Sequence, residues 1–341
     1  MIARHVRKLE AYVPGEQPRS RNVVKLNTNE NPYPPSPACA AVLKRFSPDR
    51  LRRYPDPVFS DLRAELAELN GASPECVFVG NGSDEVLSVA ARVFVEDGGA
   101  IASLDPSYSL YKTLAAIRDV KWVGVPGLAS PPRAELFLLT NPNAPTGEFR
   151  DPAEVAAFAK RFRGVVIVDE AYADFARSNC MSLATAKANR NVIVMRTFSK
   201  SYSLAGLRVG YCVGPKPLVD AMYKVKDSYN VDAVAQAVAL AAAKDQKWML
   251  GNVAKVIKTR ASFTSALERR GWDVIPSESN FVFAKPPAPA KAADIFAYLR
   301  SKNVFVRYFP GPKTGDRLRI TIGTDGQMRA LLAALDDRFR G

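Results

Sequence analysis

The stretch Val165-Val-Ile-Val-Asp-Glu-Ala-Tyr-Ala-Asp174 carries the clearest sign of the fold. Its first four residues are all β-branched and apolar, which is typical of a parallel strand buried on both faces. Polar residues begin at Asp169, where this strand ends. Because ligands bind at the carboxyl ends of strands in open α/β sheets, the pattern predicts that Asp169 lies at a binding site. A carboxylate in this place could also simply cap the segment that follows.

A second informative stretch is Arg196-Thr-Phe-Ser-Lys-Ser-Tyr-Ser-Leu-Ala-Gly-Leu-Arg208. It places the amine of Lys200 beside the hydroxyl groups of Thr197 and Ser199, and Arg208 follows eight residues after the lysine. A lysine that forms a Schiff base with a phosphorylated aldehyde needs such neighbours, because hydroxyls and a planar guanidinium can hold the phosphate. An isolated lysine would be interpreted as a surface residue, so the neighbours favour the binding site.

Two turn segments could add polar groups to the same site. Gly80-Asn-Gly-Ser-Asp-Glu85 follows an apolar run and precedes a helical pattern over residues 86–94. A glycine turn that opens a helix presents backbone N–H groups, here those of Ser83 and Asp84, to an anion, although either residue could merely cap the helix. Residues 136–147 form a strand pattern that enters a proline-rich turn, whose Asn side chains could reach a ligand oxygen or form an ordinary turn.

In this order, the motifs resemble those of the fold-type-I aminotransferases that use pyridoxal 5′-phosphate (PLP), and the likeness is greatest to the family of histidinol-phosphate aminotransferases. The likeness extends over nearly the whole chain, at residues 5–15, 25–32, 53–56, 105–111 and 317–323. The combination of Ser-Lys with a following Gly-Leu-Arg is specific, whereas the glycine and asparagine turns only support it. The resemblance implies a three-layer α/β large domain at 46–245 and a smaller α+β domain formed by 1–45 and 246–341.

The resemblance also implies a role for single residues around the cofactor. Lys200 would form the Schiff base with PLP and carry a proton during the reaction. Asp169 would pair with the pyridinium nitrogen and so keep the ring an electron sink. Tyr172 would donate to the 3-oxygen of the ring, and Tyr108 would stack on the ring face. The groups implied around the cofactor phosphate are Ser83, Asp84, Thr197, Ser199 and Arg208.

Substrate and partner residues are implied in the same way. Arg319 would hold the anionic tail of the substrate, helped by Tyr12, Asn280 and Arg307. Tyr54 would reach the cofactor phosphate of a second subunit, which implies a homodimer. The small-molecule partners would be an amino donor and a 2-oxo acid.

One position departs from the pattern of the family. Members usually have Asn directly before Pro-Thr-Gly, and this chain has Ala144 there. The contact that the missing amide would make with the ring oxygen either passes to Asn143 or is lost.

Composition agrees with an enzyme of two domains. A chain of 341 residues with 47% hydrophobic residues can bury a large core. No apolar run approaches the roughly 20 residues that span a bilayer, and the basic start leads into no apolar segment, so we expect neither a membrane span nor a secretory signal. The widely spaced Cys39, Cys76, Cys180 and Cys212 favour reduced thiols in a cytoplasmic enzyme over disulfides or a zinc site.

Histidine content and charge exclude other function classes. The single histidine, His5, leaves no multi-histidine metal site and no Ser-His-Asp triad away from itself. The net charge of +14 invites a nucleic-acid partner, but Lys and Arg are scattered along the chain and no binding module is present. We therefore expect the positive field to attract anionic substrates and a phosphorylated cofactor.

Strand and helix patterns alternate from about residue 77 to 240, as a doubly wound or three-layer α/β domain requires. Strands are predicted at 100–104 and 192–195, and helices at 151–163, 231–243 and 246–270. After Gly271 the predicted order is strand 280–284, helix 291–301, strand 304–307, strand 318–322 and helix 325–339. This terminal unit would place its arginines opposite the cofactor across a cleft between domains.

Three functions stay open on the sequence alone. The first is transamination between histidinol phosphate and 2-oxoglutarate in histidine biosynthesis. The second keeps the scaffold but acts on an aromatic or other amino acid, or decarboxylates a phosphorylated amino acid. The third is a binding or regulatory protein that retains the fold without turnover. Arginines bind phosphate and carboxylate alike, so the exact donor does not follow from these residues.

Overall fold

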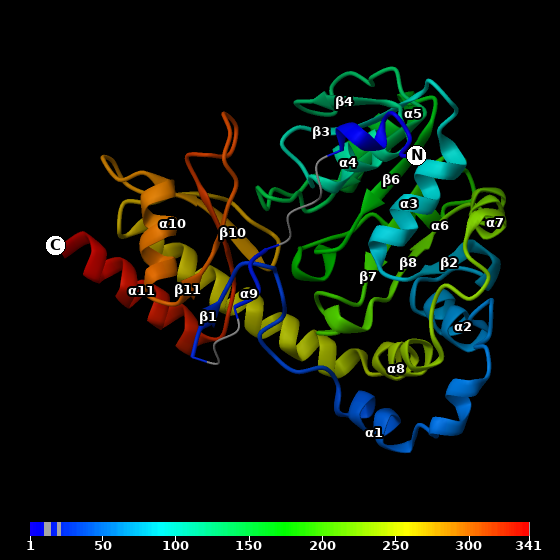
Figure 1. The fold of residues 1–341 in the computed structure, drawn as a ribbon, viewed down its shortest axis with the longest axis horizontal. Helices are drawn as coiled ribbons and strands as arrows, with labels where there is room; N and C mark the ends of the chain where they lie inside the picture. Colours follow the sequence, from blue (N-terminus) through cyan, green and yellow to red (C-terminus); the bar gives the residue numbers. More distant parts are fainter. Residues whose placement is uncertain (10–14, 19–21, 341) are drawn as a thin grey trace.

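The computed structural model describes residues 1–9, 15–18 and 22–340, and Figure 1 shows two sheet-based parts with the long helix α9 (Gln246–Glu268) extending from one to the other. The larger part contains a seven-stranded sheet in the order β2-β8-β7-β6-β5-β3-β4. Strand β8 is antiparallel to both of its neighbours, and the other strands run in one direction. The bounds are β2 Val77–Gly80, β3 Ala100–Leu104, β4 Lys121–Val125, β5 Leu136–Thr140, β6 Val165–Asp169, β7 Val192–Thr197 and β8 Gly210–Val213.

Helices cover both faces of this sheet because its strands are apolar on both faces. Within β5, Phe137 and Leu139 pack on one side, and Leu136 and Leu138 pack on the other, as the alternation along a strand requires. The expected three-layer α/β architecture is confirmed. One helical layer holds α2 Ser60–Leu69, α5 Pro152–Arg161, α6 Met181–Thr185 and α8 Ala233–Lys244, and the other holds α3 Ser83–Phe94, α4 Leu110–Ile117 and α7 Lys216–Val225.

The smaller part combines an antiparallel sheet, in the order β12-β13-β10-β9, with a parallel pair of β1 and β11. The prediction of one strand over 304–307 is wrong, because its two halves pair with different partners. β11 pairs with the N-terminal strand β1, whereas β12 pairs with β13 in the four-stranded antiparallel sheet. The bounds are β1 Val24–Lys25, β9 Asp273–Ile275, β10 Phe281–Lys285, β11 Val304–Phe305, β12 Arg307–Tyr308, β13 Leu318–Thr321, α10 Ala292–Ser301 and α11 Asp325–Arg340.

The expected domain division at residue 245 falls at the junction of α8 and α9, where Asp245 accepts a hydrogen bond from the backbone N–H of Trp248. Helix α1 (Pro37–Arg45) lies in the segment assigned to the smaller domain, yet it packs against α8, and its Cys39 belongs to the core of the larger part. The domain boundaries stay a prediction, and the packing of α1 favours placing it with the larger domain. Within the described part of the chain, none of the helices combines the length and apolar character that crossing a bilayer requires.

Candidate active site

A cavity of about 710 Å³ lies where the parallel strands end and the smaller part begins. Strands β6 and β7 end at Asp169 and Thr197, and Gly210 of β8 pairs with both Thr197 and the last residue of β2, Gly80. The segments that follow β2, β6 and β7 therefore meet at one edge of the sheet. The residues expected from the sequence that line the cavity are Ser83, Asp84, Tyr108, Asp169, Tyr172, Thr197, Ser199, Lys200, Arg208, Arg307 and Arg319.

Asp169 is buried at the end of β6, and two donors hold its carboxylate. Tyr111 Oη donates to Oδ2 at 2.8 Å, and the backbone N–H of Ala171 donates to Oδ1 at 3.1 Å. Burial raises the pKa of Asp169 to about 6, the carboxylate of Asp84 acts in the same direction, and the two donors and the charge of Lys200 oppose them. A cation bound beside Asp169 would stabilise its charged form, so this end of the cavity suits a positively charged ligand group.

Lys200 follows β7, and its amine faces the cavity. Its Nζ donates to the carbonyl oxygen of Thr28 at 3.2 Å and lies 5.8 Å from the centre of the Tyr172 ring. Burial lowers the pKa of Lys200 to about 8, and the positive charge of Arg319 acts in the same direction. A neutral amine can attack a carbonyl carbon or accept a proton, so Lys200 can act as nucleophile or base near neutral pH.

The N-terminus of α3 forms the floor of an anion site. Gly82, with a φ of 80°, precedes this helix, and a Cβ placed on it would lie 2.5 Å from Nη2 of Arg208. The glycine therefore lets the guanidinium approach the helix end, where Nη2 pairs with Oδ2 of Asp84 at 3.1 Å. The hydroxyls of Thr197 and Ser199, 3.0 Å apart, line the same cavity. A helix N-terminus, a guanidinium and two hydroxyls together suit a phosphate group.

Two arginines of the smaller part lie opposite each other at the other side of the cavity. Arg307 of β12 and Arg319 of β13 are direct partners in the antiparallel register. Their guanidinium carbons lie 5.2 and 5.1 Å from the centre of the Phe309 ring, and Nη2 of Arg319 donates to the carbonyl oxygen of Asn27 at 2.9 Å. Directly opposed like charges destabilise a sheet, so this pair indicates a site for an anionic part of a ligand.

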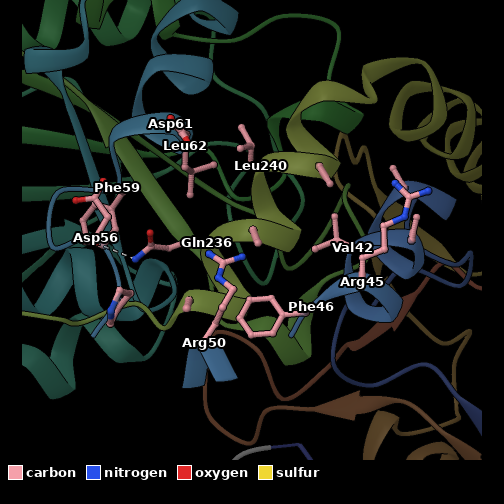
Figure 2. Close-up of a pocket in the computed structure, with 16 residues that line it drawn as sticks. Val42, Arg45, Phe46, Arg50, Asp56, Phe59, Asp61, Leu62, Gln236 and Leu240 are labelled. Carbon is pink, nitrogen blue, oxygen red and sulfur yellow. Dashed lines mark hydrogen bonds between the residues drawn. The ribbon is translucent and has the colours of Figure 1, made fainter. Parts of the chain in front are cut away.

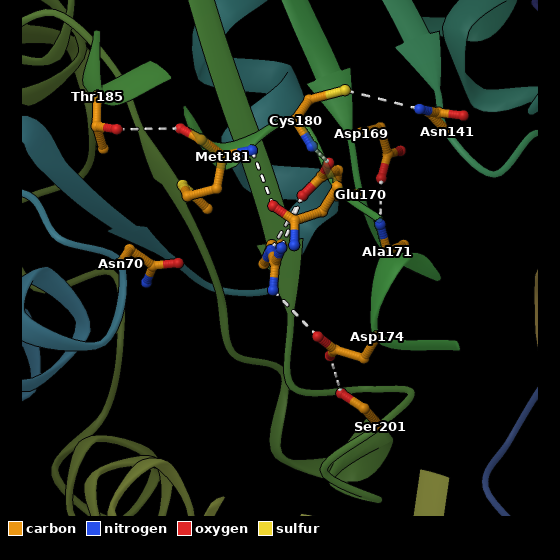
Figure 3. A network of polar contacts seen from close by, with 12 residues as sticks. Asn70, Asn141, Asp169, Glu170, Ala171, Asp174, Cys180, Met181, Thr185 and Ser201 are labelled. Atoms are coloured by element: carbon orange, nitrogen blue, oxygen red, sulfur yellow. Dashed lines mark hydrogen bonds and ion pairs between the residues drawn. The ribbon is translucent and has the colours of Figure 1, made fainter. Parts of the chain in front are cut away.

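Behind the cavity, a buried ionic network joins the end of β6 to the segment that carries Lys200. Figure 3 shows three of its members, Glu170, Asp174 and Ser201. Arg196 donates from Nη2 and Nε to one carboxylate oxygen of Glu170 at 2.9 and 3.1 Å, and from Nη1 to Asp174 at 3.0 Å. The Ser201 hydroxyl donates to the other oxygen of Asp174. Because Ser201 directly follows Lys200, the network fixes the backbone on which the lysine stands.

The structure does not bring Asn143 into the cavity. Its amide donates to the carbonyl oxygen of Pro106 at 3.1 Å and to Oγ1 of Thr146 at 3.0 Å, and its oxygen accepts from Ser107. Ala144 does line the cavity. The structure therefore gives no support to the ring-oxygen contact expected for Asn143, because the loop uses that amide to hold itself together.

Two further expected residues, Asn280 and Tyr54, do not line the cavity. Asn280 is fully buried and donates to the backbone oxygen of Asn29 at 2.9 Å, without lining the cavity. Tyr54 lies outside the cavity, 81% exposed, with its ring stacked on Tyr229 at 4.4 Å. Tyr12 lies outside the described residues. Asn280 can therefore influence the cavity of this chain only through a neighbouring residue, and Tyr54 is accessible to another molecule.

Residues 27–31 of the N-terminal segment take part in the site, although no role was expected for them. Asn27, Thr28 and Asn29 line the cavity, and Asn31 donates to the backbone oxygens of Lys200 and Ser201 at 3.1 and 3.2 Å. Asparagine at positions 27, 29 and 31 was the available signal, because asparagine side chains hydrogen-bond to nearby backbone and side-chain groups. The segment crosses between the two parts and closes one wall of the cavity.

Known proteins match the chain over nearly its whole length. Residues 21–335 match the family model of aminotransferase class I and II. The chain is 40% identical to histidinol-phosphate aminotransferase 1 of Trichormus variabilis, with 98% of both chains covered, and 42% identical to the histidinol-phosphate aminotransferase of Syntrophotalea carbinolica, with 98% of this chain and 99% of the relative covered. The crystal structure of histidinol-phosphate aminotransferase from Sinorhizobium meliloti in complex with pyridoxal-5′-phosphate is similar, with a TM-score of 0.90 at 26% identity over 99% of this chain and 97% of that one. Motifs, cavity and relatives agree, and the chain belongs to the class I and II aminotransferases.

Proposed function

We propose that this chain is a PLP-dependent aminotransferase that moves the amino group of histidinol phosphate to 2-oxoglutarate. The proposed substrate rests on one observation: the chain is 40–42% identical to histidinol-phosphate aminotransferases over nearly its full length. The opposed Arg307 and Arg319 support it, because both substrates carry an anionic group far from the reacting carbon. Tyr12 and Asn280 stay proposed as helpers of this pair.

The residues present fit PLP. The anion site at α3 suits its phosphate, Asp169 suits its ring nitrogen, and the amine of Lys200 suits its aldehyde. A Cβ on Gly210 would lie 2.4 Å from the backbone nitrogen of Ser83, so β8 can lie against the N-terminus of α3 only with a glycine there. When bound, PLP supplies a ring that withdraws electrons and stabilises negative charge on the substrate carbon.

The side chains of the chain would then bind, orient and move protons. Lys200 would hold the cofactor covalently through Nζ and, once free, take a proton from the substrate α-carbon. Its pKa of about 8 leaves part of the amine neutral at pH 7. Asp169 would keep the ring nitrogen protonated through its negative charge, and Tyr172 would donate to the ring 3-oxygen. Tyr108, whose hydroxyl lies 3.4 Å from Asp84, would stack on the ring face.

A donor screen tests this proposal directly. Purified protein with PLP and 2-oxoglutarate should form glutamate fastest with histidinol phosphate, compared with phenylalanine, tyrosine and aspartate. A preference for an aromatic amino acid would contradict the proposed donor, release of carbon dioxide would indicate a decarboxylase, and absence of turnover with every donor would indicate a binding protein. Borohydride should fix the cofactor to Lys200, and the Lys200→Ala protein should lack the visible absorbance band of the covalently bound cofactor. A label on another residue would refute the assignment of Lys200.

We also propose that the protein is a homodimer in which Tyr54 serves the site of the second subunit. Its 81% exposure supports this, as does the groove of about 660 Å³ beside the same segment. Figure 2 shows this groove, into which α1 contributes Val42 and Arg45 and α8 contributes Leu240. Mixing inactive Lys200→Ala chains with an inactive Tyr54 variant should restore part of the activity in hybrid dimers. Absence of any recovery would contradict the shared site.

We propose that the protein works in the cytoplasm and that its partners are small molecules. The four cysteines form no disulfide, and three of them are buried, which supports a reducing compartment such as the cytoplasm. We propose that the excess of positive charge attracts small anionic substrates and that nucleic acid is not a partner.

A further inference from the structure

Asn29 lies where the N-terminal segment, the cavity wall and the smaller part meet. Its residue is only 1% exposed, and its backbone has a φ of 55°, a left-handed conformation that asparagine tolerates better than most residues. Its backbone N–H donates to Oγ1 of Thr321 at 3.0 Å, and its backbone oxygen accepts from Asn280 at 2.9 Å. These two bonds therefore fix the backbone of Asn29 independently of the contacts of its own side chain.

The orientation of the Asn29 amide follows from these bonds. The Thr321 hydroxyl accepts from the backbone N–H of Asn29, and its own hydrogen points to Oδ1 of Asn29 at 3.0 Å. With Oδ1 on the threonine, the amide nitrogen faces Tyr172 and donates to its hydroxyl at 3.0 Å. An amide nitrogen can only donate, so at this contact the phenol oxygen is the acceptor.

We propose that Asn29 is a positioning residue that makes Tyr172 a hydrogen-bond donor toward the bound cofactor. A phenol has a single hydrogen, and a phenol oxygen that already accepts a bond becomes a stronger donor with that hydrogen. The inference rests on the proposed function, because the acceptor in the cavity is then the 3-oxygen of PLP. The neighbouring loop does not supply this amide, since Ala144 has none and Asn143 directs its own to Pro106 and Thr146.

This role has a spectroscopic consequence. When PLP is bound, its 3-oxygen and the nitrogen that would join it to Lys200 would compete for one proton. A donor at the oxygen stabilises its charged form, so it favours loss of the proton from the nitrogen and lowers the pKa of the bound cofactor. Loss of the Asn29 amide should therefore raise that pKa, and the net energy of one neutral hydrogen bond sets an upper limit of about 1 unit.

The test is a pH titration of the visible absorbance band of the full-length protein loaded with PLP. Asn29→Gly removes the amide and keeps the left-handed backbone accessible, and the apparent pKa of the bound cofactor should rise, by at most about 1 unit. Asn29→Asp, which replaces the donor with an acceptor, should raise it at least as much. The matched control is Asn303→Gly, an exposed turn position with a φ of 60°, which should leave the titration unchanged.

A double-mutant cycle with Tyr172→Phe separates positioning from general loosening. If Asn29 acts through the phenol, Asn29→Gly should add nothing to the shift that Tyr172→Phe produces alone. An equal shift in both backgrounds, or none in the wild-type background, would overturn the inference while the proposed function stood. Failure of wild-type protein to bind PLP at Lys200 would instead overturn the proposed function first. Should Asn29→Gly fail to fold, Asn29→Asp provides the test in the wild-type background, and an unshifted titration in that variant would equally overturn the inference.

Discussion

Replacing Arg196 by methionine should destabilise the protein strongly, because this guanidinium pairs with two acidic side chains behind the cavity. The side chain of Glu170 has no exposed surface, and one of its oxygens accepts from two nitrogens of Arg196. Asp174 accepts from the third nitrogen at 3.0 Å. Methionine fills a similar volume but leaves the buried carboxylate of Glu170 without its counter-charge.

Removing one partner of a buried ion pair costs about 3–5 kcal/mol. With an unfolding entropy of about 2.1 cal/mol/K per residue, a chain of 341 residues loses about 1.4 °C of melting temperature per kcal/mol. Arg196→Met should therefore lower the melting temperature by about 4–7 °C.

The loss should also depend on pH. Burial already raises the pKa of Glu170, and Arg196 opposes that rise. Without Arg196 the pKa rises further, so the folded protein prefers the protonated carboxyl. A group whose pKa is raised by folding contributes its full stability below its pKa in the unfolded chain, and this contribution is lost as the pH rises through its pKa in the folded protein. The deficit of Arg196→Met should therefore be larger at pH 8 than at pH 5.

Thermal unfolding of protein without added cofactor, followed by circular dichroism at both pH values, measures these effects. Adding Glu170→Gln to Arg196→Met should recover at least half of the loss, because a neutral amide needs no counter-charge. Arg63→Met is the matched control, since Arg63 contacts the neutral backbone oxygen of Val77 and the ring of Tyr223. A loss below about 1.5 °C, equal at both pH values and unchanged by Glu170→Gln, would refute the buried-charge reasoning.

Three further predictions concern the cavity. Burial lowers the pKa of Lys200 to about 8, so keeping its amine charged costs the folded protein free energy. Lys200→Met should therefore stabilise the cofactor-free protein by about 3 kcal/mol at pH 7, as measured by thermal unfolding. This gain should vanish above about pH 10.5, where the lysine is neutral in the unfolded chain as well. Gly82→Ala should weaken PLP retention in equilibrium dialysis at least about tenfold, because its Cβ would meet Arg208, whereas Gly98→Ala, with a similar φ of 78° and open space around it, should not. Lys313 forms an exposed ion pair with Asp105, at 2.6 Å, across the rim of the cavity. Lys313→Ala removes this pair, so amide hydrogen exchange in residues 309–316 should become faster, while the melting temperature should fall by less than about 1.5 °C.

The architecture and the family could be predicted from the sequence because the informative residues are local. The β-branched run before Asp169 specifies a buried strand, and the end of that strand places the carboxylate without further information. The turn with Lys200 and Arg208 likewise keeps its cofactor groups within thirteen residues. Such short-range patterns can be interpreted correctly even when the packing of distant segments is not known.

Most of the contacts that the sequence did not reveal are long-range. Asn29 meets Tyr172 and Thr321, which lie 143 and 292 residues further along the chain, and no local pattern specifies either partner. Asn143 was expected in the cavity from its motif, but the direction of its amide depends on Pro106 from another loop. Polar side chains in turns have several partners within reach, and only the assembled structure selects among them.

The parallel pairing of Val24 with Val304 sets the order in which a nascent chain can mature. At roughly 5–20 residues per second, the ribosome needs on the order of 14–56 s to add the 280 residues that separate these two positions. The seven-stranded sheet can form during that interval, whereas strand β1 must wait for its partner. The asparagine segment that follows β1 is delayed with it, so a prematurely terminated chain could fold most of its mass and still remain inactive.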